Sequence, residues 1–123
     1  MLNRKSVGNK GEEEAAKYLV KNKYKIMAKN FRCIFGEIDI IAMDGEDVVF
    51  VEVKVRRSSE YGMPEEAVTG LKQKKIIRSA LEYVKLNRLP VSNLRFDILA
   101  IGPESNRIEL IKSAFSTDGF YTY

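Results

Sequence analysis

Two apolar runs joined by a short polar linker constrain the fold of this chain more than any other feature. Residues 36–43 (GEIDIIAM) and 48–55 (VVFVEVKV) are rich in β-branched side chains, and the linker between them is Asp44-Gly45-Glu46-Asp47. An Asp-Gly pair between two strand-like runs favours a tight turn. The sequence therefore predicts a β-hairpin over residues 36–55.

The segments around this hairpin predict a small α/β domain. Residues 10–22 and 71–87 carry apolar side chains at helical spacing, and Pro90 ends the second helical region. Residues 24–31, 94–101 and 107–111 are typical of strands, and residues 56–64 form a polar loop. Residues 1–9 are expected to form a loose basic arm. The predicted order is α-β-β-β-α-β-β, with helices flanking a central mixed sheet in one domain that spans residues 1–123.

Alternation along the hairpin sorts its side chains onto two faces, because successive strand residues point in opposite directions. A turn of even length puts the apolar row on one common face; that row is Ile38, Ile40, Ala42, Val49, Val51, Val53 and Val55. The other face then carries Glu37, Asp39, Glu52 and Lys54. A two-residue turn at Asp44-Gly45 would pair Asp39 with Phe50, a residue expected in the core. A four-residue turn would pair Asp39 directly with Glu52.

Carboxylates brought together in this way repel one another, and burying them is costly without a compensating cation. Lys54 and Arg56 can neutralise part of the charge, and a divalent metal ion would neutralise more. Histidine is absent and Cys33 is the one cysteine, which excludes His-dependent triads and an intrachain disulfide. An oxygen-ligand site for a hard cation such as Mg²⁺ is the kind of metal site that this composition permits.

Glu12 lies in the first predicted helix, whose apolar stripe comprises Ala15, Ala16, Leu19 and Val20. Two interpretations of Glu12 are open. Its carboxylate points toward the sheet with the stripe, or it sits in the first helical turn, where an acid interacts favourably with the helix dipole.

The charge balance fits a polyanionic partner without proving one, because 21 Lys and Arg residues face 17 Asp and Glu residues, a net charge of +4. Basic residues either hold phosphates on both sides of the acids or form solvated surfaces; they are Arg56, Arg57, Lys72, Lys74, Lys75 and Arg78, with Arg4, Lys5 and Lys10 ahead of Glu12. Phe120, Tyr121 and Tyr123 are candidates for base stacking, for covering a sheet edge or for a dimer contact. No apolar stretch approaches the ~20 residues of a membrane span, and no signal peptide is visible, so a cytoplasmic protein is expected.

At this point the residues resemble a known arrangement. Asp39, followed after a dozen residues by Glu52-Val53-Lys54, resembles the D…ExK core of the PD-(D/E)xK nuclease superfamily. A wider set resembles the bacterial YraN family, which is similar to archaeal Holliday-junction resolvases and has a restriction-endonuclease-like fold. The resemblance covers nearly the whole chain; its segments are Gly11-Glu12, Asn30-Phe31-Arg32, 36–42, 48–56, Tyr61-Gly62, Lys72-Gln73 and Arg95-Phe96-Asp97.

The resemblance implies a role for each matching residue. Asp39, Glu52 and the Val53 carbonyl would bind Mg²⁺ or Mn²⁺, and Glu12 would supplement the metal site. Lys54 would orient the attacking water and stabilise charge on the phosphate. Gln73 resembles a second-helix glutamine of RecB-like nucleases, although that motif has Tyr four residues later and this chain has Ile77. The usual proline before the motif aspartate is also replaced, by Ile38.

The function expected first is therefore metal-dependent endonuclease cleavage of DNA, with branched or structured DNA as the substrate implied by the resemblance. A homodimer is compatible with this analogy, since resolvases cut two strands symmetrically. The alternative is a nucleic-acid-binding module that keeps the fold without cutting. A third interpretation is a structural domain in which Lys54 and Arg56 satisfy the acids as a salt-bridge network.

Overall fold

A computed structural model of the chain describes residues 4–56, 62–103 and 107–117, with backbone alone for residues 4–9. Within these residues, two helices, one short 3₁₀ helix and five strands follow one another. Their order is α1 (Arg4–Lys21), β1 (Lys25–Cys33), β2 (Gly36–Asp44), β3 (Asp47–Val55), η1 (Pro64–Ala67), α2 (Gly70–Leu86), β4 (Leu94–Ile101) and β5 (Ile108–Phe115). The predicted order of helices and strands is confirmed, with η1 added between the predicted loop over residues 56–64 and the second helix.

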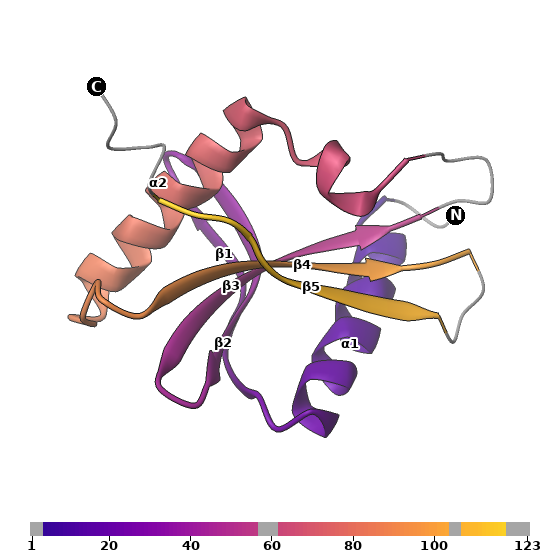
Figure 1. Ribbon diagram of the computed structural model, residues 1–123, viewed down its shortest axis with the longest axis horizontal. Helices are drawn as coiled ribbons and strands as arrows, with labels where there is room; N and C mark the ends of the chain where they lie inside the picture. Colours follow the sequence, from indigo (N-terminus) through magenta and orange to yellow (C-terminus); the bar gives the residue numbers. More distant parts are fainter. Residues whose placement is uncertain (1–3, 57–61, 104–106, 118–123) are drawn as a thin grey trace.

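The five strands form one mixed sheet in the order β1-β2-β3-β4-β5. Neighbours are antiparallel except for β3 and β4, which are parallel and are joined by a crossover through α2. The helices α1 and α2 lie on opposite faces of the sheet (Figure 1). This layered α/β arrangement is consistent with the predicted restriction-endonuclease-like core.

Each face of the sheet has its own apolar cluster. On the α2 face, Phe50, Phe96 and Ile98 pack against the buried side of α2. On the α1 face, Val49, Val51 and Leu99 pack against Ala15 and Leu19. Phe50 is buried in the core as expected. Among the described residues, no helix combines the length and the apolar character that crossing a bilayer requires.

The hairpin of β2 and β3 turns as one of the two predicted alternatives requires. Asp44 pairs with Asp47, and Ile40 pairs with Val51, so the register places Asp39 level with Glu52. Gly45 adopts a φ of 62°, in the left-handed region that glycine tolerates without a steric penalty. The turn residues are Gly45 and Glu46, so the two-residue turn predicted at Asp44-Gly45 is wrong, and the register is that of the other alternative.

The predicted face of Ile38 is wrong. Ile38 packs in the cluster on the α2 face with Ile41, whereas Ile40 packs on the α1 face. Residues three apart normally face opposite ways, so β2 reverses its alternation between Ile38 and Ile40. The neighbouring strand reverses at the same level: Ala28 and Phe31 both pack on the α2 face, and Asn30 between them has a φ of 54°. Asp39 lies at this reversal.

The first helix also differs from the prediction. It begins at Arg4, so the expected loose arm over residues 1–9 is wrong for residues 4–9, and residues 1–3 lie outside the described chain. Gly8 and Asn9, just before the predicted start at Lys10, are weak helix formers, so the local sequence did not indicate the earlier start. Gly11 has a packing role within the helix. A Cβ at Gly11 would lie 2.7 Å from Val55 Cγ2. Gly11 therefore lets α1 approach β3 closely, next to Glu12.

An ionic cluster closes the turn end of the hairpin. We define the Arg95 cluster as Tyr24, Asp44, Asp47, Arg95 and Asp97. The Arg95 guanidinium donates from Nε to Asp97 Oδ1 (3.0 Å) and from Nη2 to Asp97 Oδ2 (2.9 Å). It also donates to Asp44 (2.9 Å), Asp47 (3.2 Å) and the Tyr24 hydroxyl (2.8 Å). One cation thus ties together the hairpin, β4 and the start of β1.

Candidate metal centre

The site begins where β2 and β3 separate. Within the described strands, their backbone pairing runs from Asp44↔Asp47 to Ile40↔Val51, although both strands continue beyond that point. There the Asp39 carboxylate replaces the missing backbone partner, because the Val53 amide donates a hydrogen bond to Asp39 Oδ2 at 2.8 Å. The N–H and C=O of one strand residue point to the same edge, so the Val53 carbonyl also faces this fork.

Four carboxylates gather at the fork, and we call this set, Glu12, Glu37, Asp39 and Glu52, the acidic fork. One carboxylate oxygen from each of Glu12, Glu37 and Asp39 lies within 4.8 Å of the others. Glu52 is level with Asp39 on β3 and its side chain is 14% exposed. Two strands and α1 therefore supply acids to one place.

Glu12 reaches this place from the middle of α1. The helix begins at Arg4, so Glu12 is well past the first turn and the helix-dipole interpretation is wrong. Ala15 and Leu19 on the same stripe are buried against the sheet. Their packing sets the rotation of α1 and points the half-buried Glu12 toward Glu37 and Asp39.

A cavity of about 260 Å³ opens beside the acids on the side of α2. The residues that line it are Gly36, Glu37, Asp39, Glu52, Lys72, Lys75 and Ile76. Gly36 has a φ of 152°, and a Cβ there would lie 3.5 Å from Ser79 Oγ and 3.8 Å from Lys75 Cβ. A side chain at position 36 would therefore be strained and would narrow the space between β2 and α2.

The protonation of Asp39 is shifted by its surroundings. Burial raises the pKa of Asp39, the negative charge of Glu52 raises it further, and the charges of Glu12 and Glu37 add smaller increments. The hydrogen bond from the Val53 amide opposes these effects, and the pKa of Asp39 is about 7. Burial, together with the neighbouring acids, therefore holds Asp39 close to half-protonated at neutral pH when no cation is bound.

Lys72 supplies the cation closest to the acids. Its Nζ lies 3.2 Å from Glu52 Oε1, and it comes from the first turns of α2. Lys54, which the D…ExK resemblance implies as the catalytic lysine, is half-buried on β3. Among the described residues, Lys54 forms no ion pair with an acid and does not line the cavity. In the described part of the chain, the ion pair with Glu52 is therefore made by Lys72 and not by Lys54.

The other predicted contact residues divide into two groups. Lys75 is exposed and lines the cavity beside Lys72. Gln73 and Arg56 hold local structure instead, because Gln73 Nε2 donates to the Val68 carbonyl at 3.1 Å and Arg56 Nη2 donates to the Gly62 carbonyl at 2.5 Å. The remaining predictions, for Arg57, Phe120, Tyr121 and Tyr123, lie outside the described residues.

Sequence reasoning found the acids but missed two cations. Lys72 was predicted only as a phosphate contact, and the role of Arg95 was not predicted at all. The sequence offered little signal for Lys72, because the second helix carries several lysines and only the packing angle of α2 selects one. Arg95 could have been found from its position two residues before Asp97, since residues two apart on a strand share a face.

The donor set of the fork suits a hard divalent cation. Its side-chain ligands are carboxylate oxygens, which Mg²⁺ and Mn²⁺ prefer, and the Val53 carbonyl edge adds another oxygen. Burial and the charge of Glu52 raise the pKa of Asp39, and a bound cation would oppose both effects. Asp39, Glu52 and the Val53 carbonyl, with Glu12 and Glu37 beside them, fit the metal that the sequence resemblance implies.

The fold and the acids define the class first: an α/β protein with a restriction-endonuclease-like core and a carboxylate cluster where two of its strands separate. The chain belongs to UPF0102, an uncharacterised protein family whose model matches residues 11–101. The predicted membership of the YraN family is thereby confirmed.

Individual relatives match along nearly their full length. The UPF0102 protein of Syntrophus aciditrophicus (strain SB) is 53% identical over 110 residues, 88% of this chain and 87% of the relative. The UPF0102 protein of Geobacter metallireducens is 47% identical over 116 residues, 93% of this chain and 95% of the relative. That of Lachnoclostridium phytofermentans is 47% identical over 119 residues, 96% of this chain and 99% of the relative.

Proposed function

We propose that this protein is a Mg²⁺- or Mn²⁺-dependent endonuclease that hydrolyses phosphodiester bonds of DNA, including branched or structured DNA. The observation that carries the proposal is the acidic fork, where Asp39 has a raised pKa among three other carboxylates. Grouped carboxylates repel one another and destabilise a fold unless a cation binds them. Carboxylates with shifted pKa values in a cleft are typical of functional sites. The lysines on the cavity wall add the positive charge that a phosphate requires.

Each residue of the fork has a role in this proposal. Asp39, Glu52 and the Val53 carbonyl would hold the metal ion, and Glu12 and Glu37 would position its water ligands. When bound, such an ion supplies Lewis-acid polarisation of a phosphate oxygen and a lowered pKa for coordinated water. Lys72 and Lys75 contact phosphate oxygens on the side of α2, and Lys54 adds positive charge at the β3 end of the site.

Lys72 has two successive partners in this scheme. Without a metal ion it balances the charge of Glu52, at an Nζ to Oε1 distance of 3.2 Å. If a metal ion were held by Glu52, the Lys72 side chain, which is long and 47% exposed, would be available to contact a substrate phosphate. We place this activity in the cytoplasm and, for a four-way junction, in a homodimer that cuts two strands symmetrically.

The test is cleavage of labelled linear, flapped, single-stranded and four-way-junction DNA with Mg²⁺ or Mn²⁺. Wild type is compared with Asp39→Asn, Glu52→Gln and Lys54→Ala, and Glu109→Gln, an exposed acid on β5, is the matched control. We expect metal-dependent products that the first three variants lose and the control keeps. Products that persist in Asp39→Asn would assign the cleavage to a contaminating nuclease and overturn the proposal.

The alternative function is a nucleic-acid-binding module that does not cut. The observation that favours it is Lys54, which among the described residues neither pairs with an acid nor lines the cavity. This alternative predicts salt-sensitive DNA binding that is unchanged in Asp39→Asn, with no product on any substrate. Calorimetry with Mn²⁺ separates the two functions further, because the binding module requires no metal affinity at the fork.

A further inference from the structure

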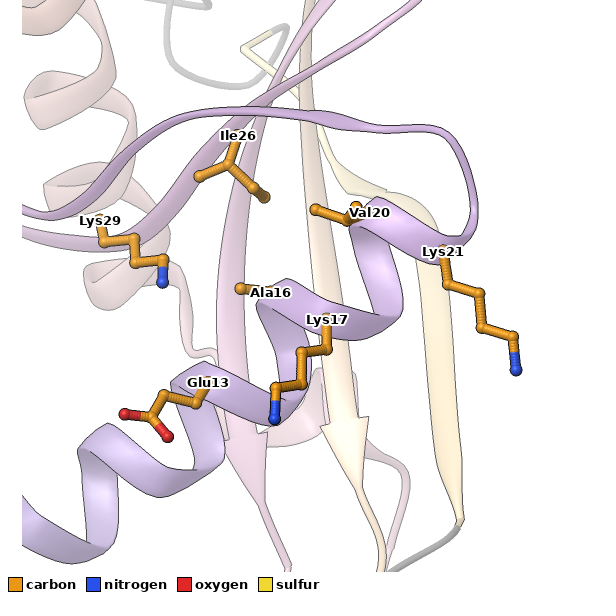
Figure 2. Close-up of a pocket in the computed structure, with 7 residues that line it drawn as sticks. All are labelled: Glu13, Ala16, Lys17, Val20, Lys21, Ile26 and Lys29. Atoms are coloured by element: carbon orange, nitrogen blue, oxygen red, sulfur yellow. The ribbon is translucent and has the colours of Figure 1, made fainter.

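A second concave surface lies away from the acids, between α1 and β1 (Figure 2). We call it the α1–β1 groove; it encloses about 530 Å³ and is lined by Glu13, Ala16, Lys17, Val20, Lys21, Ile26 and Lys29. None of these residues belongs to the acidic fork or to the cavity beside it. The groove is therefore a separate surface, and its role does not depend on the proposed nuclease activity.

The floor of the groove is aliphatic and partly open to solvent. Val20 belongs to the apolar residues at helical spacing in α1, and it is 57% exposed. Ile26 is half-buried, and Figure 2 shows Val20, Ala16 and Ile26 around the space between the helix and the strand. An exposed apolar surface of this kind gains free energy when another apolar group covers it.

The rim of the groove carries an excess of positive charge. Lys17, Lys21 and Lys29 are exposed, and Glu13 is the one acid among the lining residues. In Figure 2, Lys29 extends from β1 while Lys17 and Lys21 extend from the solvent side of α1. Three ammonium groups around an apolar floor are complementary to a ligand with several carboxylates and an aliphatic group.

The chemistry of the floor favours a peptide over a nucleic acid. Single-stranded nucleic acids bind where aromatic side chains stack on bases, and the groove lining contains no aromatic residue. In addition, β1 is an edge strand of the described sheet, so its outer backbone groups can pair with an extended segment laid along the groove. Aliphatic side chains, carboxylates and backbone amides are together the features of an acidic peptide.

We propose that the α1–β1 groove binds a short acidic segment of another protein, with one aliphatic side chain of that segment seated between Val20 and Ile26. The lysines on the rim hold the carboxylates of the segment at either side. Such a contact would recruit the protein to a partner while leaving the acidic fork open to its own ligand.

The experiment uses a fluorescein-labelled peptide, Asp-Asp-Leu-Asp-Ile-Asp, and fluorescence anisotropy at moderate salt. We expect saturable binding that weakens at least tenfold in Val20→Asp and in the double variant Lys17→Glu with Lys21→Glu. Val91→Asp is the matched control, because Val91 is also exposed (65%) and lies in the turn region after α2; it should bind the peptide as wild type does. A second peptide with Ser in place of Leu and Ile should bind at least tenfold more weakly.

Three results would overturn the proposal. Equal binding of the Ser-containing peptide would show that bare charge attracts the probe and that the floor contributes nothing. Loss of DNA binding in Val20→Asp with no peptide binding to wild type would make the groove a nucleic-acid surface. A wild-type dimer that becomes monomeric in Val20→Asp, seen by sedimentation, would make a second copy of the chain the occupant.

Discussion

Two groups of carboxylates in this protein are built in opposite ways. In the Arg95 cluster, three aspartates surround one guanidinium, and the fully buried Asp97 also accepts a hydrogen bond from the Ser113 amide at 3.0 Å. In the acidic fork, the cations that pair with the carboxylates among the described residues are the exposed side chains of Arg32, 3.6 Å from Glu37, and Lys72, 3.2 Å from Glu52. The Val53 amide is the donor to Asp39. The first group is satisfied by its own residues, whereas the second is not.

The pKa values follow this difference. The hydrogen bond from Arg95 holds the pKa of Asp44 below its ordinary value. Burial disfavours the charge of Arg95, but its hydrogen bonds to Asp97 and Asp44 outweigh burial and raise the pKa of Arg95. Asp39 shifts the other way, upward to about 7. A satisfied cluster stabilises one fold, and an under-compensated cluster stays available to bind a ligand.

The largest effect is expected at the Arg95 cluster. Arg95→Met should lower the free energy of unfolding by about 3–5 kcal/mol, because it leaves buried Asp97 without its cation. Urea denaturation measures this loss, with Arg107→Met, an exposed arginine, as the control expected to change stability by less than about 0.5 kcal/mol. A loss below about 1 kcal/mol would mean that the cluster is not a structural clamp.

The second largest effect is expected from metal binding, which should stabilise the protein through the acidic fork and not through the Arg95 cluster. Mn²⁺ at one hundred times its dissociation constant should stabilise wild type by about 2.7 kcal/mol, and Asp39→Asn should abolish this gain. The affinity should rise as the pH rises toward about 7, because the proton on Asp39 must leave before the carboxylate binds metal. Thermal unfolding with and without Mn²⁺ at several pH values measures both effects. An equal gain in Asp39→Asn would place the metal elsewhere.

Substitution of one aspartate in each cluster should change stability in opposite directions. In metal-free buffer above pH 7, Asp39→Asn should stabilise the protein by about 1–3 kcal/mol, since each pKa unit corresponds to about 1.4 kcal/mol and partial solvent access reduces the full shift. Asp97→Asn should destabilise it, because the buried amide binds the guanidinium poorly.

Ionisation of Asp39 should destabilise the folded protein as the pH rises. The folded-state pKa is raised from 3.8 to about 7, so the folded protein binds the Asp39 proton more tightly than the unfolded chain does. The destabilisation is therefore absent below the ordinary pKa, grows as the pH rises, and is complete above about 7. The advantage of Asp39→Asn should vanish at pH 4 in urea titrations with EDTA. An advantage that is constant with pH would exclude Asp39 ionisation as its cause.

The smallest effect is expected from removing the ion pair between Glu52 of the acidic fork and Lys72 of α2. Lys72→Met should lower the Mn²⁺ dissociation constant by about fivefold, or about 1 kcal/mol, because Glu52 loses a competing partner at 3.2 Å. Lys75→Met is the matched control, since Lys75 lines the same cavity and forms no ion pair with Glu52 among the described residues. If calorimetry gives the same change in the Mn²⁺ dissociation constant for both variants, the loss of any nearby positive charge explains it. Lys72 would then not compete specifically with Mn²⁺ for Glu52.

Local sequence patterns predicted the parts of the fold that depend on neighbouring residues. The Asp-Gly pair and the two apolar runs gave the hairpin and two alternative registers, one of which places Asp39 level with Glu52, as observed. The helical spacing around Ile77 and Val84 gave α2 almost to its observed ends. These features follow from the strand and helix periods, which each short segment carries by itself.

Other features of the site depend on contacts between distant segments. Arg95 binds Asp44 across 51 positions of sequence, and Lys72 pairs with an acid on β3 because of how α2 crosses the sheet. Periodicity describes one strand or helix at a time, so it does not identify the partner of a charged side chain. The start of α1 was also missed, because Gly8 and Asn9 ahead of the predicted start are weak helix formers.

The sequence by itself determined the hairpin and the presence of carboxylates without histidine, because turn chemistry, alternation and composition are local properties. It left two registers open, and the structure selects one of them. Only the tertiary structure decided where the strand pairing stops and how Asp39 is directed there. A single side-chain bond from the Val53 amide replaces the backbone ladder, and both β1 and β2 reverse their alternation at that level. The reversal needs two strands to shift together, so no pattern within one strand predicts it.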